Sequence, residues 1–209
     1  MNSEISPERG WRGSRELWLG AATEALIEGG IDAVKILPLA KKLGLSRTSF
    51  YWFFKDRRQL LAMLLNRWED TTTRPLVAAT RDYAASQTEA MLNVIGLFLS
   101  DASFDARLER AVRAWAQQDA DVLLRLQQAD AERLAALRDM LAHWGHDPQD
   151  SDVRARTIYL VQVGYISMGV NEPLQERLAR FPSYVEIYTG ARPTKAEMDR
   201  LRGRIGAKV

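Results

Sequence analysis

Apolar side chains recur at every third or fourth position through most of this 209-residue chain. That spacing places them along one face of an α-helix, and no run of Val, Ile, Thr or aromatic residues alternates at period two between turn signals. The sequence therefore predicts an all-α protein. Its length is sufficient for one large domain, or for a small domain joined to a larger one.

Start and stop signals predict four helices in the first third of the chain. Helices favour Ser or Asp before their first residue and Gly after their last, and they accept Pro in their first turn. The signals are Ser14 and Gly29–Gly30 for the first helix, Pro38 and Gly44 for the second, Ser46 for the third (Arg47–Phe54), and Asp56 for the fourth, which continues to Trp68.

Longer helices and a more acidic composition follow Pro75. These helices are predicted over Gln87–Ser100, Phe104–Gln117, Asp121–His143 and Ser151–Val170, and from Thr194 through Ile205. Prolines are expected to separate shorter pieces near the end of the chain, at Pro173, Pro182 and Pro193. We therefore predict a small N-terminal domain over residues 1–70 and a larger C-terminal helical bundle over residues 71–209.

Between Lys35 and Trp68 the chain is strongly basic. This span contains eight cations and one acid, a net charge of +7, whereas the other 21 cations and 26 acids of the chain give −5. A basic module in an acidic chain predicts a polyanionic partner for that module alone. A solvated basic helix face is the alternative interpretation, and charge by itself fits both.

Residues 36–54 have the pattern of a helix-turn-helix motif within a three-helix domain. The sequence LGLS at residues 43–46 joins two short helices, with the small Ala40 where they must approach and Gly44 where the exit needs a positive φ. In such a motif the second helix lies in the DNA major groove. Its exposed start carries residues able to read base edges or bind phosphates, namely Arg47, Thr48 and Ser49. A purely structural αα-hairpin has a similar pattern.

Five consecutive aromatic residues, at positions 50–54, continue the third predicted helix. Residues three or four apart share a helix face, so Phe50, Phe53 and Phe54 are predicted to enter a small core. Tyr51 and Trp52 then face outward. We predict that these two contact DNA, and an exposed structural role is the alternative.

Two cations lie close to the start of the fourth predicted helix, where free backbone N–H groups and the positive helix end favour an anion. They are Lys55 and Arg57, which we predict to contact DNA phosphates.

The segment Trp11–Asp70 resembles the DNA-binding domain of the TetR family of bacterial transcriptional regulators. The features that carry the resemblance are the Leu39–Ser46 turn, Phe50-Tyr51, Phe54-Lys55 and Leu60-Leu61. The resemblance implies that Tyr51 donates its hydroxyl to a phosphate and that Trp52 packs on the sugar-phosphate backbone or a thymine methyl. Two positions depart from the family pattern: Phe53 stands where many members have a phosphate-contacting His, and Arg57 where they usually have Lys. The expected DNA contacts are therefore Arg47, Thr48, Ser49, Tyr51, Trp52, Lys55 and Arg57.

For the C-terminal bundle, the resemblance implies a homodimer that holds a small-molecule effector. Helix Ser151–Val170 contains small residues that let helices approach, and we predict dimer contacts at Gly164, Tyr165 and Ser167. A central core helix is the alternative. Seven large apolar or amphipathic residues are expected to surround an effector pocket, although such residues are also typical of a plain core. They are Trp68, Met91, Phe98, Trp115, Met140, Trp144 and Tyr159.

These features predict a TetR-like transcriptional regulator, a repressor that binds a palindromic double-stranded DNA operator as a dimer and is released by a small molecule. The alternative is a DNA-bound architectural or partner-regulated protein without a ligand switch. No catalytic motif is visible, and His143 and His146 are separated by a helix end at Gly145, so neither an enzyme nor a metal or cofactor site is expected. The absence of Cys, of a secretory leader and of an apolar run of membrane length predicts a cytoplasmic protein.

Overall fold

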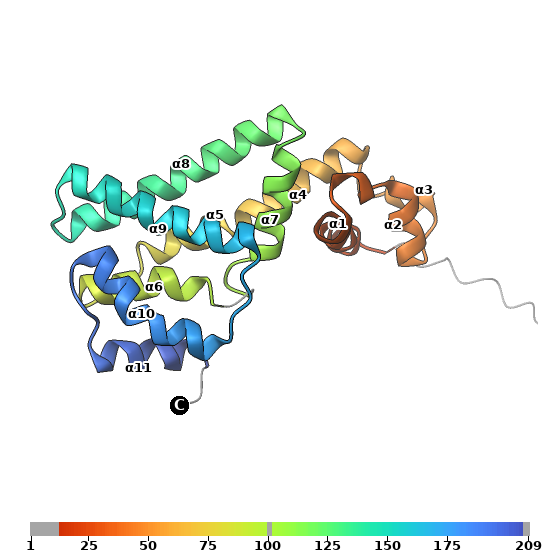
Figure 1. The fold of residues 1–209 in the computed structure, drawn as a ribbon. Coiled ribbons are helices and arrows are strands. Elements are labelled where there is room, and N and C mark those ends of the chain that lie inside the picture. Colours follow the sequence, from red (N-terminus) through yellow and green to blue (C-terminus); the bar gives the residue numbers. More distant parts are fainter. Residues whose placement is uncertain (1–12, 100–101, 207–209) are drawn as a thin grey trace, which may run out of the picture. The chain divides into compact units, whose positions relative to one another are not determined.

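The computed structural model describes residues 13–99 and 102–206, and all regular elements within these ranges are helices (Figure 1). The all-α prediction is confirmed. The chain divides into two compact units, residues 1–66 and residues 67–209. Helix α4 (Arg57–Thr71) begins in the first unit and ends in the second.

The first unit contains α1 (Arg15–Gly29), the 3₁₀ helix η1 (Ile31–Ala33), α2 (Ile36–Leu43), α3 (Arg47–Phe50) and most of α4. Three predicted caps are present. The side chain of Ser14 accepts a hydrogen bond from Leu17 N at 3.1 Å, that of Ser46 from Ser49 N at 3.3 Å, and that of Asp56 from Gln59 N at 2.8 Å. Trp18, Phe50 and Phe54 form an aromatic core, with 5.3 Å between the first two rings and 5.0 Å between the last two.

The turn between α2 and α3 has the predicted geometry. Gly44 adopts φ 64° and ψ 26°, in the left-handed region that glycine enters without a Cβ clash. Leu45 N donates to Ala40 O at 2.9 Å, and Ala40 is buried between the helices. The turn therefore positions the start of α3 from the end of α2.

Helix α3 is shorter than the predicted range of residues 47–54. Its α-helical part ends at Phe50, and residues 51–53 continue as a tighter turn in which Tyr51 N, Trp52 N and Phe53 N each bond the carbonyl three residues earlier. Phe54 is fully buried, as predicted, but Phe53 is only half-buried. Phe53 is therefore less buried than predicted, because the α-helix ends before this residue.

The second unit contains the rest of α4 and seven further helices, which Figure 1 shows with α8 beside α9 and α10 beside α6. They are α5 (Thr73–Ala79), α6 (Gln87–Leu97), α7 (Ala106–Ala116), α8 (Ala120–His143), α9 (Pro148–Met168), α10 (Leu174–Thr189) and α11 (Lys195–Arg204). Its apolar core contains residues from all of these except α7, including Leu76, Met91, Leu137, Ile158, Val185 and Leu201.

One prediction for this unit is wrong, and one helix was missed. Pro182 does not separate two pieces but lies inside α10, whose neighbouring Phe181 and Val185 are buried in the core. Their burial offsets the hydrogen bond that Pro182 cannot donate, a defect that costs about 3 kcal/mol in a helix interior. Helix α5 was not predicted, and it contains Pro75 in its first turn, where proline is tolerated. The predicted end at Ser100 lies outside the described residues.

Helix α11 is attached to the start of α6 through one buried carboxylate. Glu197 completes the capping box of Thr194, accepting from its backbone N at 2.6 Å and its hydroxyl at 2.8 Å. The same carboxylate accepts from Ser86 and, at 2.9 Å, from Thr88. Burial alone would raise the pKa of Glu197, but these hydrogen bonds outweigh it and lower the pKa from 4.5 to about 2.

This depressed pKa predicts a pH-dependent stability. The contribution of ionised Glu197 is fully present above pH 4.5 and is lost as the pH falls towards 2, amounting to at most about 3 kcal/mol. The excess stability of the wild type over Glu197→Gln should therefore shrink as acid is added, which urea unfolding at a series of pH values measures. Glu132→Gln, at an exposed position on α8, is the control. A constant difference between wild type and Glu197→Gln at all pH values would contradict the assignment.

Candidate nucleic-acid interface and the polar sites of the C-terminal unit

The start of α3 presents an exposed surface of cationic, hydroxyl and aromatic side chains. Arg47 and Thr48 are exposed on its first turn, and Tyr51 and Trp52 follow, with Trp52 63% exposed. Lys55 is exposed at the next bend. Arg47 Nη2 donates to the hydroxyl of Tyr51 at 3.3 Å, so the two side chains already form a pair. We call Arg47, Thr48, Tyr51, Trp52 and Lys55 the α3 surface.

Two residues predicted to contact DNA have other roles in the structure. Ser49 is buried, and its hydroxyl donates to Ser46 O at 2.7 Å, so it belongs to the cap of α3 and not to the α3 surface. The half-buried guanidinium of Arg57 donates from Nε to Val34 O at 2.6 Å and from Nη2 to Ile31 O at 3.0 Å. It therefore attaches the start of α4 to η1, where the sequence pattern predicted a phosphate contact.

The other cations of the basic span differ in how they are used. Lys42 Nζ lies 2.9 Å from Glu24 and 3.9 Å from Glu28, and the hydrogen bond to Glu24 raises its pKa. Lys42 therefore has acidic neighbours on α1, as a solvated helix face would have. The sequence did not single out Arg15, which is exposed and donates from Nη2 to Phe53 O at 3.2 Å, beside the aromatic turn.

A buried polar network lies in the second unit around Arg133 of α8 and Glu109 of α7. Both side chains are almost completely inaccessible, and Arg133 Nη1 lies 2.8 Å from Glu109 Oε1. Trp68 Nε1, from the last part of α4, donates to Glu109 Oε2 at 2.6 Å. Arg133 also donates to the hydroxyl of Thr72, at 2.9 Å, and to that of Tyr159, at 2.9 Å. The network thus holds the end of α4 against α7, α8 and α9.

The residues predicted to line an effector pocket are distributed, in the described part of the chain, over the core, the buried network and two separate surface pockets. Trp68 and Tyr159 belong to the buried network, and Met91 is part of the apolar core. Trp115 is buried on α7. Phe98 lines one surface pocket, whereas Met140 and Trp144 line a different one. Most of the set therefore packs as core, which was the alternative interpretation.

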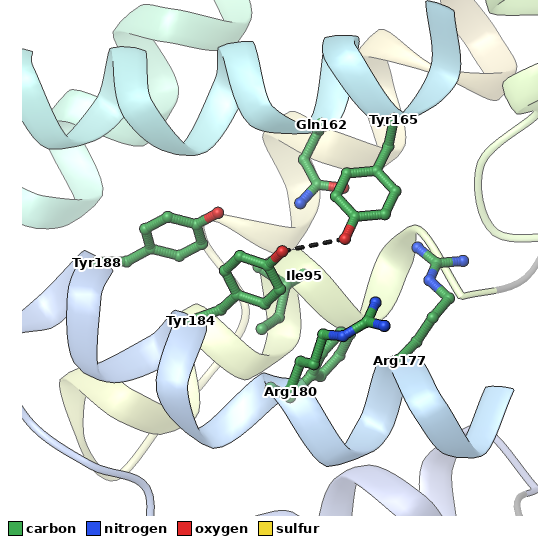
Figure 2. A pocket seen from close by; sticks show the side chains of 8 residues that line it. Ile95, Gln162, Tyr165, Arg177, Arg180, Tyr184 and Tyr188 are labelled. Carbon is green, nitrogen blue, oxygen red and sulfur yellow. Dashed lines mark hydrogen bonds between the residues drawn. The ribbon is translucent and has the colours of Figure 1, made fainter. Parts of the chain in front are cut away.

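A cavity that the sequence did not reveal lies between α6, α9 and α10. Its walls are Ile95, Gln162, Tyr165, Arg177, Arg180, Phe181, Tyr184 and Tyr188. We call it the tyrosine cavity. Figure 2 shows its tyrosine rings and Gln162 turned towards one space, with the hydroxyls of Tyr165 and Tyr184 joined at 3.0 Å. Tyr165, predicted to be a dimer contact, instead points into this cavity.

One face of α9 and the adjoining part of α10 expose large apolar side chains. Val153, Leu160 and Met168 lie on the outer side of α9, and Ile187 of α10 is exposed as well. Arg154 Nη1 donates to Ile187 O at 3.1 Å, which places the two helices next to each other at this point. Gly164 and Ser167 fall on the same side of α9. We call Val153, Leu160, Met168 and Ile187 the α9–α10 face.

These features define an all-α protein with a helix-turn-helix unit whose second helix is exposed at its start, followed in the chain by a larger helical unit. Within the described ranges, no helix combines the length and apolar character that crossing a membrane requires.

Comparisons with known proteins agree with this description. The family model for bacterial regulatory proteins of the tetR family matches residues 19–64. Tetracycline repressor protein class D of Escherichia coli and class H of Photobacterium damsela subsp. piscicida are each 43% identical to the chain over 51 residues. The match covers 24% of this chain and 23% of each repressor, so it spans about a quarter of their length.

Solved structures share the fold over nearly the whole chain. AmtR from Mycobacterium smegmatis has a TM-score of 0.64 at 19% identity, covering 97% of this chain and 99% of its own. A protein from Mesorhizobium loti described as a TetR-family transcriptional regulator has a TM-score of 0.59 at 15% identity, covering 91% of this chain and 95% of its own. The N-terminal unit therefore matches the tetR family model, and the whole chain shares the fold of these solved structures.

Proposed function

We propose that this chain is a TetR-family transcriptional regulator that binds a two-fold-symmetric DNA operator as a homodimer in the cytoplasm, represses transcription, and is released by a small molecule. The observation that carries the proposal is the α3 surface, which follows the helix-turn-helix turn directly and is exposed at its cationic, hydroxyl and aromatic positions. A helix that enters the major groove contacts base edges with its N-terminal residues, which are Arg47 and Thr48 here.

Each member of the α3 surface has a distinct expected contact. The guanidinium of Arg47 can form a bidentate pair with guanine O6 and N7, and Thr48 can bond a base edge or a phosphate. Tyr51 donates to a phosphate and Trp52 packs against the sugar-phosphate backbone or a thymine methyl, as the family resemblance implies. Lys55 contributes a phosphate contact. Ser49 and Arg57 support this surface from behind through the hydrogen bonds described above.

Two substitutions separate base reading from phosphate binding. Arg47→Ala should weaken binding to the operator by about 1 to 3 kcal/mol relative to random DNA, because a bidentate guanine contact is lost. Lys55→Ala should weaken binding to both DNAs about equally and reduce the slope of log affinity against log salt by about one unit. Fluorescence anisotropy titrations with both duplexes measure these effects. An equal loss on both DNAs for Arg47→Ala would reassign this residue to phosphate.

Selection from a random duplex library tests the proposal as a whole. Sequencing of the bound fraction should give a palindrome whose half-sites are centred about 34 Å apart, or a multiple of that distance, because two recognition helices related by a two-fold axis contact successive turns. Repeated selection without enrichment of any sequence would contradict the proposal.

The α9–α10 face supports the homodimer. Three of its exposed apolar side chains recur at helical spacing on α9, and large apolar side chains grouped on one exposed face are typical of a protein interface. Small residues beside them, Gly164 and Ser167, allow close helix approach. Tyr165 lines the tyrosine cavity, so the proposed dimer contacts do not include it.

The buried network supports a ligand switch that acts through α4. Trp68 lies in the last turn of α4 and Thr72 directly follows this helix, and both are hydrogen-bonded into the network. A ligand that displaces α9 or α7 would therefore bias the position of α4 and change operator affinity by about 1 to 3 kcal/mol of coupling. DNA must then weaken ligand binding by the same factor.

The competing function is a DNA-bound architectural or partner-regulated protein without a ligand. A thermal-shift screen of metabolites distinguishes the two, because a ligand that binds only the folded protein raises its melting temperature. A compound that stabilises the protein and also releases the selected operator supports the switch. Stabilising compounds that all leave operator binding unchanged would favour the alternative.

A further inference from the structure

The tyrosine cavity contains hydrogen-bond donors without acceptors. Tyr188 is 2% exposed, and within the described part of the chain its hydroxyl has no hydrogen-bond partner. Tyr165 and Tyr184 share one hydrogen bond, so only one of their two hydroxyl protons is used between them. Burial raises the pKa of the Tyr188 hydroxyl, which therefore stays a donor at neutral pH. A buried donor without a partner is costly, which marks this space as one that receives an acceptor from outside.

The walls of the cavity combine flat apolar surfaces with the polar side chains of Gln162, Arg177 and Arg180. Ile95 and Phe181 close it from α6 and α10, and the rings of Tyr184 and Tyr188 stack with 5.8 Å between centroids. As it stands, the enclosed space of about 20 Å³ has room for roughly one water molecule. A larger ligand must therefore displace side chains, and Tyr184 and Arg177 are only half-buried at the rim.

A second, wider pocket adjoins this cavity and shares Gln162, Tyr165 and Arg177 with it. Two further arginines of α7, Arg107 and Arg110, line the wider pocket, and its other lining residues within the described part of the chain are uncharged apart from Arg177. Among the residues that the structure describes, neither these two arginines nor Arg177 has an ion-pair partner, whereas the neighbouring Arg180 lies 2.6 Å from Glu172.

The backbone at the end of α9 permits this gathering of guanidinium groups. Gly169 has φ 63°, and a Cβ on it would lie 2.9 Å from Arg110 Nη1. Three guanidinium groups around one pocket repel each other unless an anion lies among them. Guanidinium matches carboxylate and phosphate groups with paired N–H donors.

From this arrangement we propose that the effector is a small organic anion with a flat aromatic body. Its carboxylate or phosphate binds Arg107, Arg110 and Arg177, and its ring enters the tyrosine cavity, where an acceptor atom on the ring takes the free hydrogen bond of Tyr188. This inference rests on the proposed function, because it assigns the chemistry of the proposed effector.

The first test measures ligand binding to the full chain without DNA. The probes are benzoate, 4-methoxybenzoate, 2-naphthoate and indole-3-acetate, each paired with its primary amide, together with phenyl phosphate. Thermal shift and calorimetry should show stabilisation by anions of this panel and at least about tenfold weaker binding of the matching amides. Comparison of the affinities of phenyl phosphate and benzoate decides whether the site prefers a phosphate or a carboxylate. Equal binding of anions and amides, or no binding by any anion of the panel, would overturn the proposal.

Variants locate the site. Arg177→Gln should weaken binding of the anions by about ten- to a hundredfold and leave the amides unaffected, because only the charged group loses a charge-assisted hydrogen bond. The matched control is Arg192→Gln. Arg192 is exposed beyond the end of α10 and pairs with Glu186, so this variant should bind the anions as the wild type does. Wild-type affinity in Arg177→Gln would refute this placement of the anion.

Tyr188→Phe separates a binding role from a structural one. Removal of a buried, unpaired hydroxyl should raise the melting temperature of the free protein, by about 2 to 4 °C, while weakening binding of 4-methoxybenzoate about fivefold. A lower melting temperature with unchanged affinity would show that the hydroxyl is structural.

Failure of this inference and failure of the proposed function give different results. Anions that bind at the tyrosine cavity without releasing the selected operator would leave the site assignment intact and remove the switch. An intact, sequence-selective operator complex with no anion binding would remove the site assignment alone.

Discussion

The Arg133→Met protein is expected to lose about 3 to 5 kcal/mol of unfolding free energy, because the substitution leaves the carboxylate of Glu109 buried without its principal counter-charge. Glu109 is completely buried, and methionine fills a similar volume without supplying donors. Burial would raise the pKa of Glu109, but Arg133 beside it holds that pKa below its ordinary value. Once Arg133 is removed, the uncompensated burial cost remains.

The remaining contacts do not replace this pair. Glu109 still accepts from Trp68 at 2.6 Å and from Arg113 at 2.8 Å, but Arg113 is also bonded to Asp130 at 2.6 Å. The network also fixes Thr72 and Thr73 through the guanidinium of Arg133, and both hydroxyls lose these bonds. We therefore expect the destabilisation to be accompanied by a looser end of α4.

A double substitution tests whether the cost arises from the unpaired charge. Arg133→Met with Glu109→Leu should be more stable than Arg133→Met alone, because a buried ion pair is often replaceable by apolar side chains of similar volume. Arg138→Met is the control, since Arg138 is half exposed, lies 3.7 Å from Asp152 and should contribute less than about 1 kcal/mol. Urea unfolding measures the wild type, Arg133→Met, Glu109→Leu, the double variant and Arg138→Met. A loss below 1 kcal/mol for Arg133→Met, or additive losses in the double variant, would contradict a charge-based account.

The Leu160→Glu protein is expected to be monomeric and to bind its operator poorly. Leu160 is 62% exposed at the middle of the α9–α10 face, and a two-fold axis there would bring two introduced carboxylates into one apolar interface. Like-charge contact in an interface costs several kcal/mol, so the dimer dissociation constant should rise by about a hundredfold or more. Operator affinity should fall with it, because a single half-site contact replaces two.

Sedimentation equilibrium and operator titrations measure this effect. Tyr83→Glu is the matched control, because Tyr83 is 90% exposed in the turn before α6, outside the α9–α10 face, and should leave the dimer unchanged. Circular dichroism verifies that both variants remain folded, as expected for substitutions at exposed sites. A Leu160→Glu protein that stays dimeric and binds the operator normally would assign the dimer interface to another surface.

Local chemistry explains why much of the fold was predictable from the sequence. The caps at Ser14, Ser46, Asp56 and Thr194 depend on hydrogen bonds within one turn, and all four are present. The left-handed Gly44 in the helix-turn-helix turn is equally local. The continuation of α10 through Pro182 could not be predicted in this way. It depends on the burial of α10 in the core, which is a property of the whole unit.

The candidate sites were harder to predict, because the destination of a polar side chain depends on distant residues. Arg57 bonds carbonyls of η1, and Ser49 turns back to Ser46, although both fit a phosphate-binding pattern in the sequence. Large Trp and Met residues pointed to an effector pocket but pack mostly as core. The spacing of Tyr184 and Tyr188, one helical turn apart, was the available signal for the tyrosine cavity, and the assumed break at Pro182 concealed it.

The most direct test of the central claim is the affinity ratio between the selected palindrome and a scrambled duplex of equal length, measured at physiological salt. The account predicts binding of two protomers per palindrome, tighter than binding to the scrambled duplex by at least about a thousandfold. The same affinity for both duplexes, with the same dependence on salt, would show that the α3 surface binds phosphates alone and would contradict a sequence-reading regulator.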